Sequence, residues 1–240
     1  MDISRITGWL DRTLKVADFD DVSNNGVQIA GSGRDVTVAA VAVDASVRAV
    51  EEAASAGAGL LVVHHGISWG GGVRRLVGGV YSVVKAAIEA DLALYACHLP
   101  LDAHPSLGNN ARLAKLLGLS RVRRAFCYHG NVIGLVGENA HRRMVTIGGR
   151  DFEIPRGRIG VCSGGAGEFA EEAKALGCDL FLTGEAGWGD VVAAENCGMR
   201  MICAGHYETE VFGVRAVAAA ARRALKIKIV DLTAKTPSGK

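Results

Sequence analysis

Residues 60–66 read LLVVHHG, a short apolar run that ends in two histidines and a glycine. Runs of this kind, rich in valine and bounded by glycine, are typical of strands that are covered on both faces. In open α/β sheets, ligands bind just beyond the carboxyl ends of the strands. His64 and His65 are therefore candidates for metal binding or acid–base catalysis. The alternative is one exposed histidine beside one that is satisfied by a hydrogen bond.

An alternation of strands and helices extends from this stretch over most of the chain. Strands are predicted at residues 36–43, 60–63, 92–97, 158–162, 180–183, 199–204 and 227–232, and helices at 2–16, 47–56, 80–90, 110–117, 168–176, 190–196 and 211–224. Such alternation favours parallel pairing with right-handed crossovers. We therefore predict the α/β class, with a three-layer helix–sheet–helix architecture.

Three segments interrupt this pattern. Residues 18–34 are predicted to form a loop, in which Asn25-Gly26 signals a turn that is either structural or lines a site. Residues 120–157 are less regular, with short strands predicted at 131–137 and 143–147. Residues 233–240 are predicted to form a mobile tail.

The two halves of the chain repeat one another. The stretch AGAGLL at 56–61 parallels LGCDLF at 176–181, and YACHLPLD at 95–102 parallels CAGHYETE at 203–210. The second pair places a histidine four residues before a carboxylate, directly after a predicted strand. We therefore predict two similar β-α repeat halves, 1–124 with the HHG and HxPLD motifs and 125–240 with the GHYETE motif, which together form one intertwined unit.

Composition limits the class of protein. The 240 residues carry a formal net charge of +2, and 49% of them are hydrophobic but only 5% aromatic. A chain of this length buries roughly 70–75% of its unfolded surface, so it needs neither disulfide nor metal to fold. Nothing in the charge calls for nucleic acid, and no apolar window is long enough to span a membrane. The six cysteines match no disulfide framework and the N-terminus resembles no signal peptide, which favours a reducing cytoplasm.

Polar residues gather at the predicted strand ends. They are His64, His65, His98, Asp102, His206 and Glu210. If the halves pack about a pseudo-twofold axis, these side chains meet in one cleft and could hold two divalent cations. Imidazole with carboxylate suits zinc, iron or manganese better than calcium. Glu210 is the natural bridge, because its two oxygens could each bind one ion, and two ions ~3.5–4 Å apart would activate a bridging water.

The same motifs resemble the GTP cyclohydrolase I type 2 family, the NIF-three-like dinuclear-metal proteins. The resemblance covers essentially the whole chain and rests on HHGISW at 64–69, HLPLD at 98–102, GHYETE at 205–210, NNGVQ at 24–28, Asp44, GNN at 108–110 and TGE at 183–185. It implies a dinuclear site ligated by His64, His65, Asp102, His206 and Glu210. It also implies a toroidal homo-hexamer whose metal sites face an inner cavity. Many members carry a histidine on the helix after the Gly-Glu turn, and residues 186–196 contain none.

Several other residues near these motifs have both a functional and a structural interpretation. His98 repeats His206 without being a ligand in the family pattern, so it is a candidate catalytic acid or base, with a structural hydrogen bond as the alternative. The turn Ser163–Gly167 could receive a phosphate or could be a tight turn that needs glycine. Trp69 and Trp188 could stack on a planar substrate or simply pack, and Glu185 could line the cleft.

Two classes of function remain open. The first is a metal-dependent hydrolase that acts on a nucleotide, phosphorylated or cyclic-amide substrate, and the family resemblance implies opening of the GTP purine ring. No guanine-reading motif is present in the sequence. The second is a metal-binding oligomeric scaffold, regulatory partner or metal chaperone without catalysis. Activity that is lost when Glu210 is replaced would distinguish the first class from the second.

Overall fold

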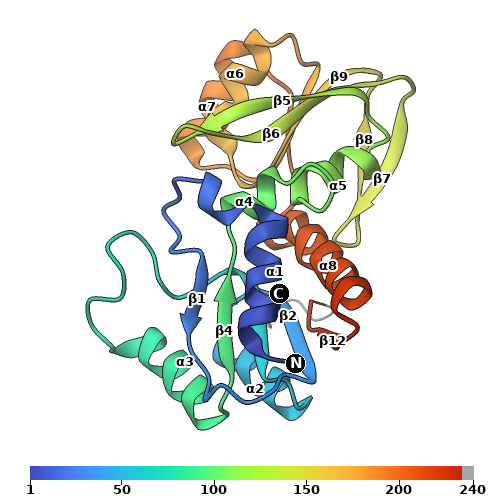
Figure 1. Ribbon diagram of the computed structural model, residues 1–240. Coiled ribbons are helices and arrows are strands. Elements are labelled where there is room, and N and C mark those ends of the chain that lie inside the picture. The colour runs from blue at the N-terminus through green and yellow to red at the C-terminus, as the bar shows by residue number, and fades with distance from the viewer. Residues whose placement is uncertain (234–240) are drawn as a thin grey trace. The chain divides into compact units, whose positions relative to one another are not determined.

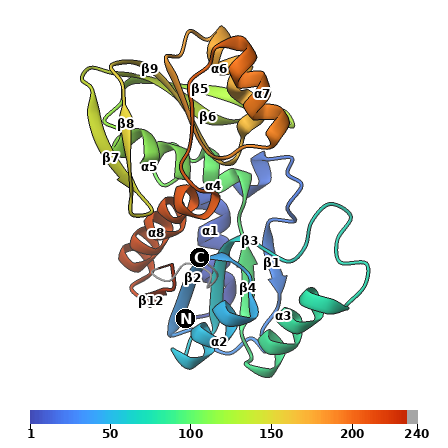
Figure 2. The same ribbon diagram turned by 180° about the vertical axis from the view of Figure 1, so that it is seen from behind.

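The computed structural model describes residues 1–233 and confirms the α/β class (Figures 1 and 2). The chain forms two compact units, one from residues 1–101 together with the chain from Val214 onward, the other from residues 102–213. Each unit has its own five-stranded sheet. The predicted tail at 233–240 lies outside the described residues except for Thr233.

The sheet of the first unit has the strand order β1-β4-β3-β2-β12. Its strands are β1 (Gly26–Ile29), β2 (Val38–Asp44), β3 (Leu60–His65), β4 (Ala93–Ala96) and β12 (Lys228–Asp231). Strands β12, β2, β3 and β4 are parallel, as the alternation with helices predicts, whereas β1 is antiparallel to β4. The register pairs Asp44 with His65, which places a carboxylate beside the second histidine of the HHG motif.

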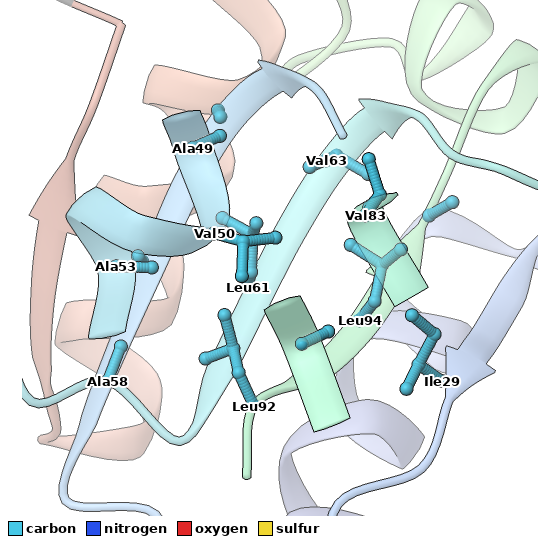
Figure 3. Close-up of a cluster of buried hydrophobic side chains, with 14 residues drawn as sticks. Ile29, Ala49, Val50, Ala53, Ala58, Leu61, Val63, Val83, Leu92 and Leu94 are labelled. Carbon is cyan, nitrogen blue, oxygen red and sulfur yellow. The ribbon is translucent and has the colours of Figure 1, made fainter. Parts of the chain in front are cut away.

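Helices cover both faces of this sheet. On one face lie α2 (Val47–Ser55) and α3 (Gly78–Glu89), whose apolar side chains form a buried cluster with Leu61, Val63 and Leu94 (Figure 3). The adjacent Tyr95 points to the other face, where its hydroxyl donates to Asp11 of α1 (Ile3–Leu14) at 2.7 Å. Because successive residues of a strand point to opposite faces, Leu94 and Tyr95 together demonstrate the three layers.

The sheet of the second unit has the order β11-β10-β9-β6-β5. Its parallel strands are β9 (Gly157–Gly165), β10 (Leu180–Glu185) and β11 (Met201–Cys203), while β6 (Asn131–Asn139) and β5 (Ser120–Tyr128) continue it antiparallel. A separate hairpin joins β7 (Arg143–Ile147) to β8 (Arg150–Ile154). The arginines at 121, 123 and 124 lie exposed on edge strand β5, where charge opposes edge-to-edge pairing.

This second sheet is also covered on both faces. Leu180 and Leu182 pack against α5 (Asn109–Leu116), the β7–β8 hairpin and Phe212 of α8 (His206–Leu225). Phe181 points the other way and contacts Phe126. The backbone N–H of Phe126 donates to the carboxylate of Glu172 on α6 (Ala170–Ala175) at 3.3 Å. Helix α7 (Trp188–Cys197) packs against α6. The remaining elements are α4 (Leu99–Ala103) and the short 3-10 helices η1 (Val16–Asp18) and η2 (Gly167–Phe169).

The two sheets repeat the motif that the sequence predicts. Strands β2, β3 and β4 with helices α2 and α3 correspond to β9, β10 and β11 with α6 and α7, and His65 and Glu185 occupy the last position of equivalent six-residue strands. The compact units do not end where the contiguous halves 1–124 and 125–240 end: residues 102–124 belong to the second unit, and β12 returns to pair with β2 in the first sheet. Within residues 1–233, no helix is long and apolar enough to cross a membrane.

Candidate metal centre

Two histidines stand at the carboxyl end of β3, where the sequence places them. His64 is fully buried, and its Nδ1 lies 3.0 Å from the carbonyl oxygen of Cys97. His65 is partly exposed, and its Nδ1 lies 2.8 Å from Oδ1 of Asp44. Their ring centroids are 4.6 Å apart. An oxygen acceptor at Nδ1 holds each ring as the Nδ1–H tautomer, so Nε2 is the nitrogen that carries the lone pair.

His98 joins this pair from the turn after β4. Its ring centroid lies 5.1 Å from that of His64 and 5.8 Å from that of His65, and one nitrogen from each of the three rings falls within 4.8 Å of the others. Its Nδ1 is 2.9 Å from Oδ1 of Asp21. Thus all three imidazoles of this cluster have an oxygen at Nδ1, which is the arrangement that metal-ligating histidines almost always show.

The segment 21–28 holds the two loops that carry these histidines. Gln28 Oε1 accepts the backbone N–H groups of Ile67 and Ser68 at 2.7 and 3.1 Å, directly after the HHG motif. Asn25 Oδ1 accepts the N–H of His98 at 2.8 Å. Gly66 must be glycine because a Cβ atom there would collide with the Gln28 side chain and with Ala96. Asn25 therefore lines the candidate site, although no turn forms at Asn25-Gly26, because Gly26 begins strand β1.

In the second unit, His206 opens helix α8 and Glu210 follows one turn later. His206 Nε2 lies 3.3 Å from Glu210 Oε1, and its Nδ1 lies 3.0 Å from Glu185 Oε1 at the end of β10. The hydrogen bond to Glu210, opposed by burial and aided by Glu185, raises the pKa of His206 to about 9. Without metal this imidazole is protonated at neutral pH, so a cation must displace a proton in order to bind it.

Asp102 is buried elsewhere in the same unit. Its Oδ1 accepts from Asn109 Nδ2 at 2.8 Å and from Ser163 Oγ at 3.1 Å. Asn109 is held in turn by the N–H of Gly213, at 2.6 Å from its Oδ1. Ser163, predicted to open a turn, lies in strand β9 and contributes a side chain that orients Asp102. A Cβ atom at Gly164 would collide with the Glu210 carboxylate, so glycine there leaves room for that group.

The structure shows which of the predicted residues lie close together within one unit. His64, His65 and His98 form one cluster in the first unit, and His206 lies beside Glu210 in the second. Glu185 contacts His206, which gives it an orienting role. Trp69 contacts the His98 ring by its edge, with centroids 5.2 Å apart, whereas Trp188 is 82% exposed.

Sequence reasoning missed Asp21 and the amides that orient Asp102. Asp21 accepts hydrogen bonds from the turn that carries His98, yet it lies 77 residues away in the chain. Its only local signal is its place four residues before Asn25, which itself donates to it at 2.9 Å. Asn109 and Asn110 were visible as a pair at a helix start, but nothing in the sequence indicates what they contact.

Geometry of this kind defines an α/β protein of two β-α repeats with imidazole and carboxylate groups suited to divalent metal. Comparison with known proteins assigns it more closely: the chain belongs to the Duf34/NIF3 (NGG1p interacting factor 3) family, whose model matches residues 1–237. It is 42% identical over 226 residues to a GTP cyclohydrolase 1 type 2 homolog of Deinococcus radiodurans, covering 88% of this chain and 85% of that protein. A homolog from Pyrococcus horikoshii bearing the same name is 37% identical over 245 residues, or 96% of this chain and 97% of the other.

A solved structure shares the fold over the full length. The protein ybgI, described as of unknown function, is 28% identical and superposes with a TM-score of 0.85, covering 99% of this chain and 100% of the other. The names of the relatives therefore agree with the family resemblance that the HHG, HxPLD and GHYETE motifs indicate.

Proposed function

We propose that this protein is a metal-dependent hydrolase that acts on a nucleotide, phosphorylated or cyclic-amide substrate. The observation that carries the proposal is the hydrogen bonding of its histidines. His64, His65 and His98 each have an oxygen acceptor at Nδ1, and His206 has a carboxylate on either side. Such support orients imidazoles for metal and raises their basicity. One such bond would also suit a structural histidine, but three histidines held in this way within one cluster favour a site.

The proposed ligands are those that the family resemblance implies: His64, His65, Asp102, His206 and Glu210. Three imidazoles and two carboxylates suit two ions of zinc, iron or manganese. When bound, such ions would supply Lewis acidity toward a phosphoryl or carbonyl oxygen. The chain's own contribution is orientation, because Asp44, Glu185 and Asn109 each hold one proposed ligand in place. His98 is the proposed acid or base.

A hydrolase of this kind should act on at least one member of a panel of nucleotides, phosphodiesters and cyclic amides. The protein, loaded separately with zinc, iron(II) and manganese, would be assayed for release of phosphate or a ring-opened product. Activity should disappear in Glu210→Gln and in chelated wild-type protein. If no substrate reacts while two metals per chain are bound, the alternative of a non-enzymatic metal-binding scaffold, regulatory partner or metal chaperone takes its place.

We also propose a homo-oligomer, with the toroidal hexamer of the family resemblance as its form. Its support in this chain is the exposed face of α3. Tyr81 and Ile88 are each more than half exposed and lie seven residues apart on one side of α3, and Val77, directly before the helix, is also more than half exposed. Exposed apolar side chains that gather on one face often mark a protein–protein contact.

The free thiols of all six cysteines agree with a reducing compartment, and we propose the cytoplasm.

Replacing Ile88 by lysine should dissociate this oligomer. Burial of an isoleucine contributes about 1.5–3 kcal/mol, so its loss should weaken association by at least about tenfold per contact. Light scattering over a dilution series would measure the mass against the 25.0 kDa chain. Glu51→Lys introduces the same side chain on exposed α2 and should leave the mass unchanged. A wild-type protein that is monomeric at micromolar concentration would contradict the proposal.

A further inference from the structure

The side chain of Asp21, only 2% exposed, is held by four hydrogen-bond donors. Its Oδ1 accepts from the N–H of Ser23 at 3.0 Å and lies 2.9 Å from His98 Nδ1. Its Oδ2 accepts from Asn25 Nδ2 at 2.9 Å and from the N–H of Leu99 at 2.8 Å. A carboxylate has about four lone-pair positions, and all of them are used here.

This arrangement determines the tautomer of His98. Ser23, Asn25 and Leu99 present groups that can only donate, so the Asp21 side chain must accept at both oxygens. Burial opposes ionisation of Asp21, but the hydrogen bond and the charge of His98 lower its pKa to about 2. An ionised carboxylate has no proton to give, so the contact at 2.9 Å requires His98 to donate from Nδ1. The lone pair of the neutral ring then lies at Nε2.

Other contacts hold the His98 ring and its backbone. The N–H of His98 donates to Asn25 Oδ1 at 2.8 Å, and Leu99, the next residue, donates to Asp21. Trp69 packs its ring against the His98 ring in an edge contact, and the indole N–H is held by the carbonyl of Gly66 at 3.0 Å. The side chain is 17% exposed, so protein contacts fix its position while part of it remains accessible.

We propose that Asp21 is the positioning residue of His98, holding its imidazole as the Nδ1–H tautomer so that Nε2 offers a hydrogen-bond acceptor beside His64 and His65. This inference rests on the proposed function. It specifies what the neutral ring can meet: an O–H or N–H of the substrate, a water molecule, or a cation, each of which takes the lone pair of Nε2. Asp21 would act only through His98 and would touch neither substrate nor metal.

The direct test is the tautomer of His98 in the full-length wild-type protein. Long-range 1H–15N correlation spectra of zinc-loaded and chelated protein distinguish a protonated from an unprotonated ring nitrogen, and His98→Gln identifies the signals by their loss. We expect Nδ1 of His98 to be protonated and Nε2 to be unprotonated with and without zinc. An Nε2–H tautomer in the wild-type protein would overturn the proposal. This measurement does not depend on the folding of any variant.

A matched pair of substitutions tests whether Asp21 is the cause. Asp21→Asn should shift or abolish the Nδ1–H signal of His98, since an amide offers an NH₂ group where the carboxylate only accepts. Asp44→Asn is the same change at the partner of His65, and should alter the His65 signals while it leaves those of His98 in place. If His98 keeps its Nδ1–H tautomer in folded Asp21→Asn protein, Asp21 only holds the backbone and side chains of the segment 21–28, and the proposal is wrong.

This result is separable from that of the proposed function. If the protein binds metal in the expected amount and His98 shows the other tautomer, the inference about Asp21 fails alone. If the protein binds no metal, the proposed function fails, and with it the role of Nε2 as an acceptor beside a metal site.

Discussion

Glu210→Gln should lose most of its bound metal. Glu210 lies buried beside His206 at 3.3 Å, and the family resemblance makes it the ligand shared by both ions. The amide keeps the shape of the side chain but removes the negative charge and replaces one acceptor oxygen with a donor. Loss of a group that merely orients a ligand typically costs 10–100-fold in metal affinity, so loss of a shared ligand should cost more than about 100-fold. Elemental analysis of protein purified without chelator would measure the change against wild type, for which we expect about two divalent ions per chain.

The control lies on the same turn of the same helix. Glu208→Gln makes the identical change two residues earlier, where the side chain packs against Gly148 and Gly205 and is not a proposed ligand. It should retain wild-type metal. His98→Gln should lose less metal than Glu210→Gln, because His98 is the proposed acid or base. Equal metal content in Glu210→Gln and wild type would remove Glu210 from the site, and a wild-type content near zero that added zinc, iron(II) or manganese does not restore would refute the metal centre itself.

Removal of metal should lower stability without unfolding the protein. The two apolar clusters that pack each sheet against its helices contain none of the proposed ligands, so the cores do not depend on the ion. At free metal about 100-fold above its dissociation constant, one site adds roughly 2.7 kcal/mol to the free energy of unfolding. For a chain of 150–250 residues, this corresponds to a fall in melting temperature of roughly 5–10 °C on chelation.

Circular dichroism melts of chelated and zinc-restored protein would measure this difference. The chelated protein should keep its helical signal at 25 °C and unfold cooperatively, and added zinc should restore the higher melting temperature in wild type but far less in Glu210→Gln. The contrary result would be loss of the folded signal at 25 °C on chelation. That outcome would make the metal a structural element of the fold, as it is in zinc fingers, and would contradict the functional role proposed here.

Local pattern carried much of the fold prediction. The predicted helix at 47–56 is observed at Val47–Ser55, and the predicted strand at 60–63 begins at Leu60 and continues through both histidines to His65. These segments are readable because a buried parallel strand and an amphipathic helix impose a period on residues that are close in sequence. The internal repeat was equally visible, since equivalent strands end in equivalent polar residues. His64 and His65 follow from the same rule, because polar side chains directly after an apolar strand lie at its carboxyl end, whereas the full set of proposed ligands is what the family resemblance implies.

The pairing of strands that are distant in the chain could not be predicted from local sequence patterns. Residues 26–29, predicted to be loop, form strand β1 antiparallel to β4, and the last strand, which follows the second repeat in sequence, pairs with β2 in the first sheet. Strand β5 also escaped prediction, because its run of exposed arginines lacks the alternation of a half-buried strand. An edge strand needs only one partner and a few apolar contacts, so its sequence is weakly constrained.

The sequence by itself determined the α/β class, the repeat and the residue types that could bind metal, since these depend on composition and on spacing over a few residues. Only the tertiary structure decided how the histidines are held. Asp21 reaches His98 across 77 positions, Gln28 reaches Ile67 across 39, and the register of β2 with β3 sets Asp44 beside His65. Hydrogen bonds of this kind depend on where distant segments come together in space, and a side chain's chemistry alone does not specify which donor it will meet.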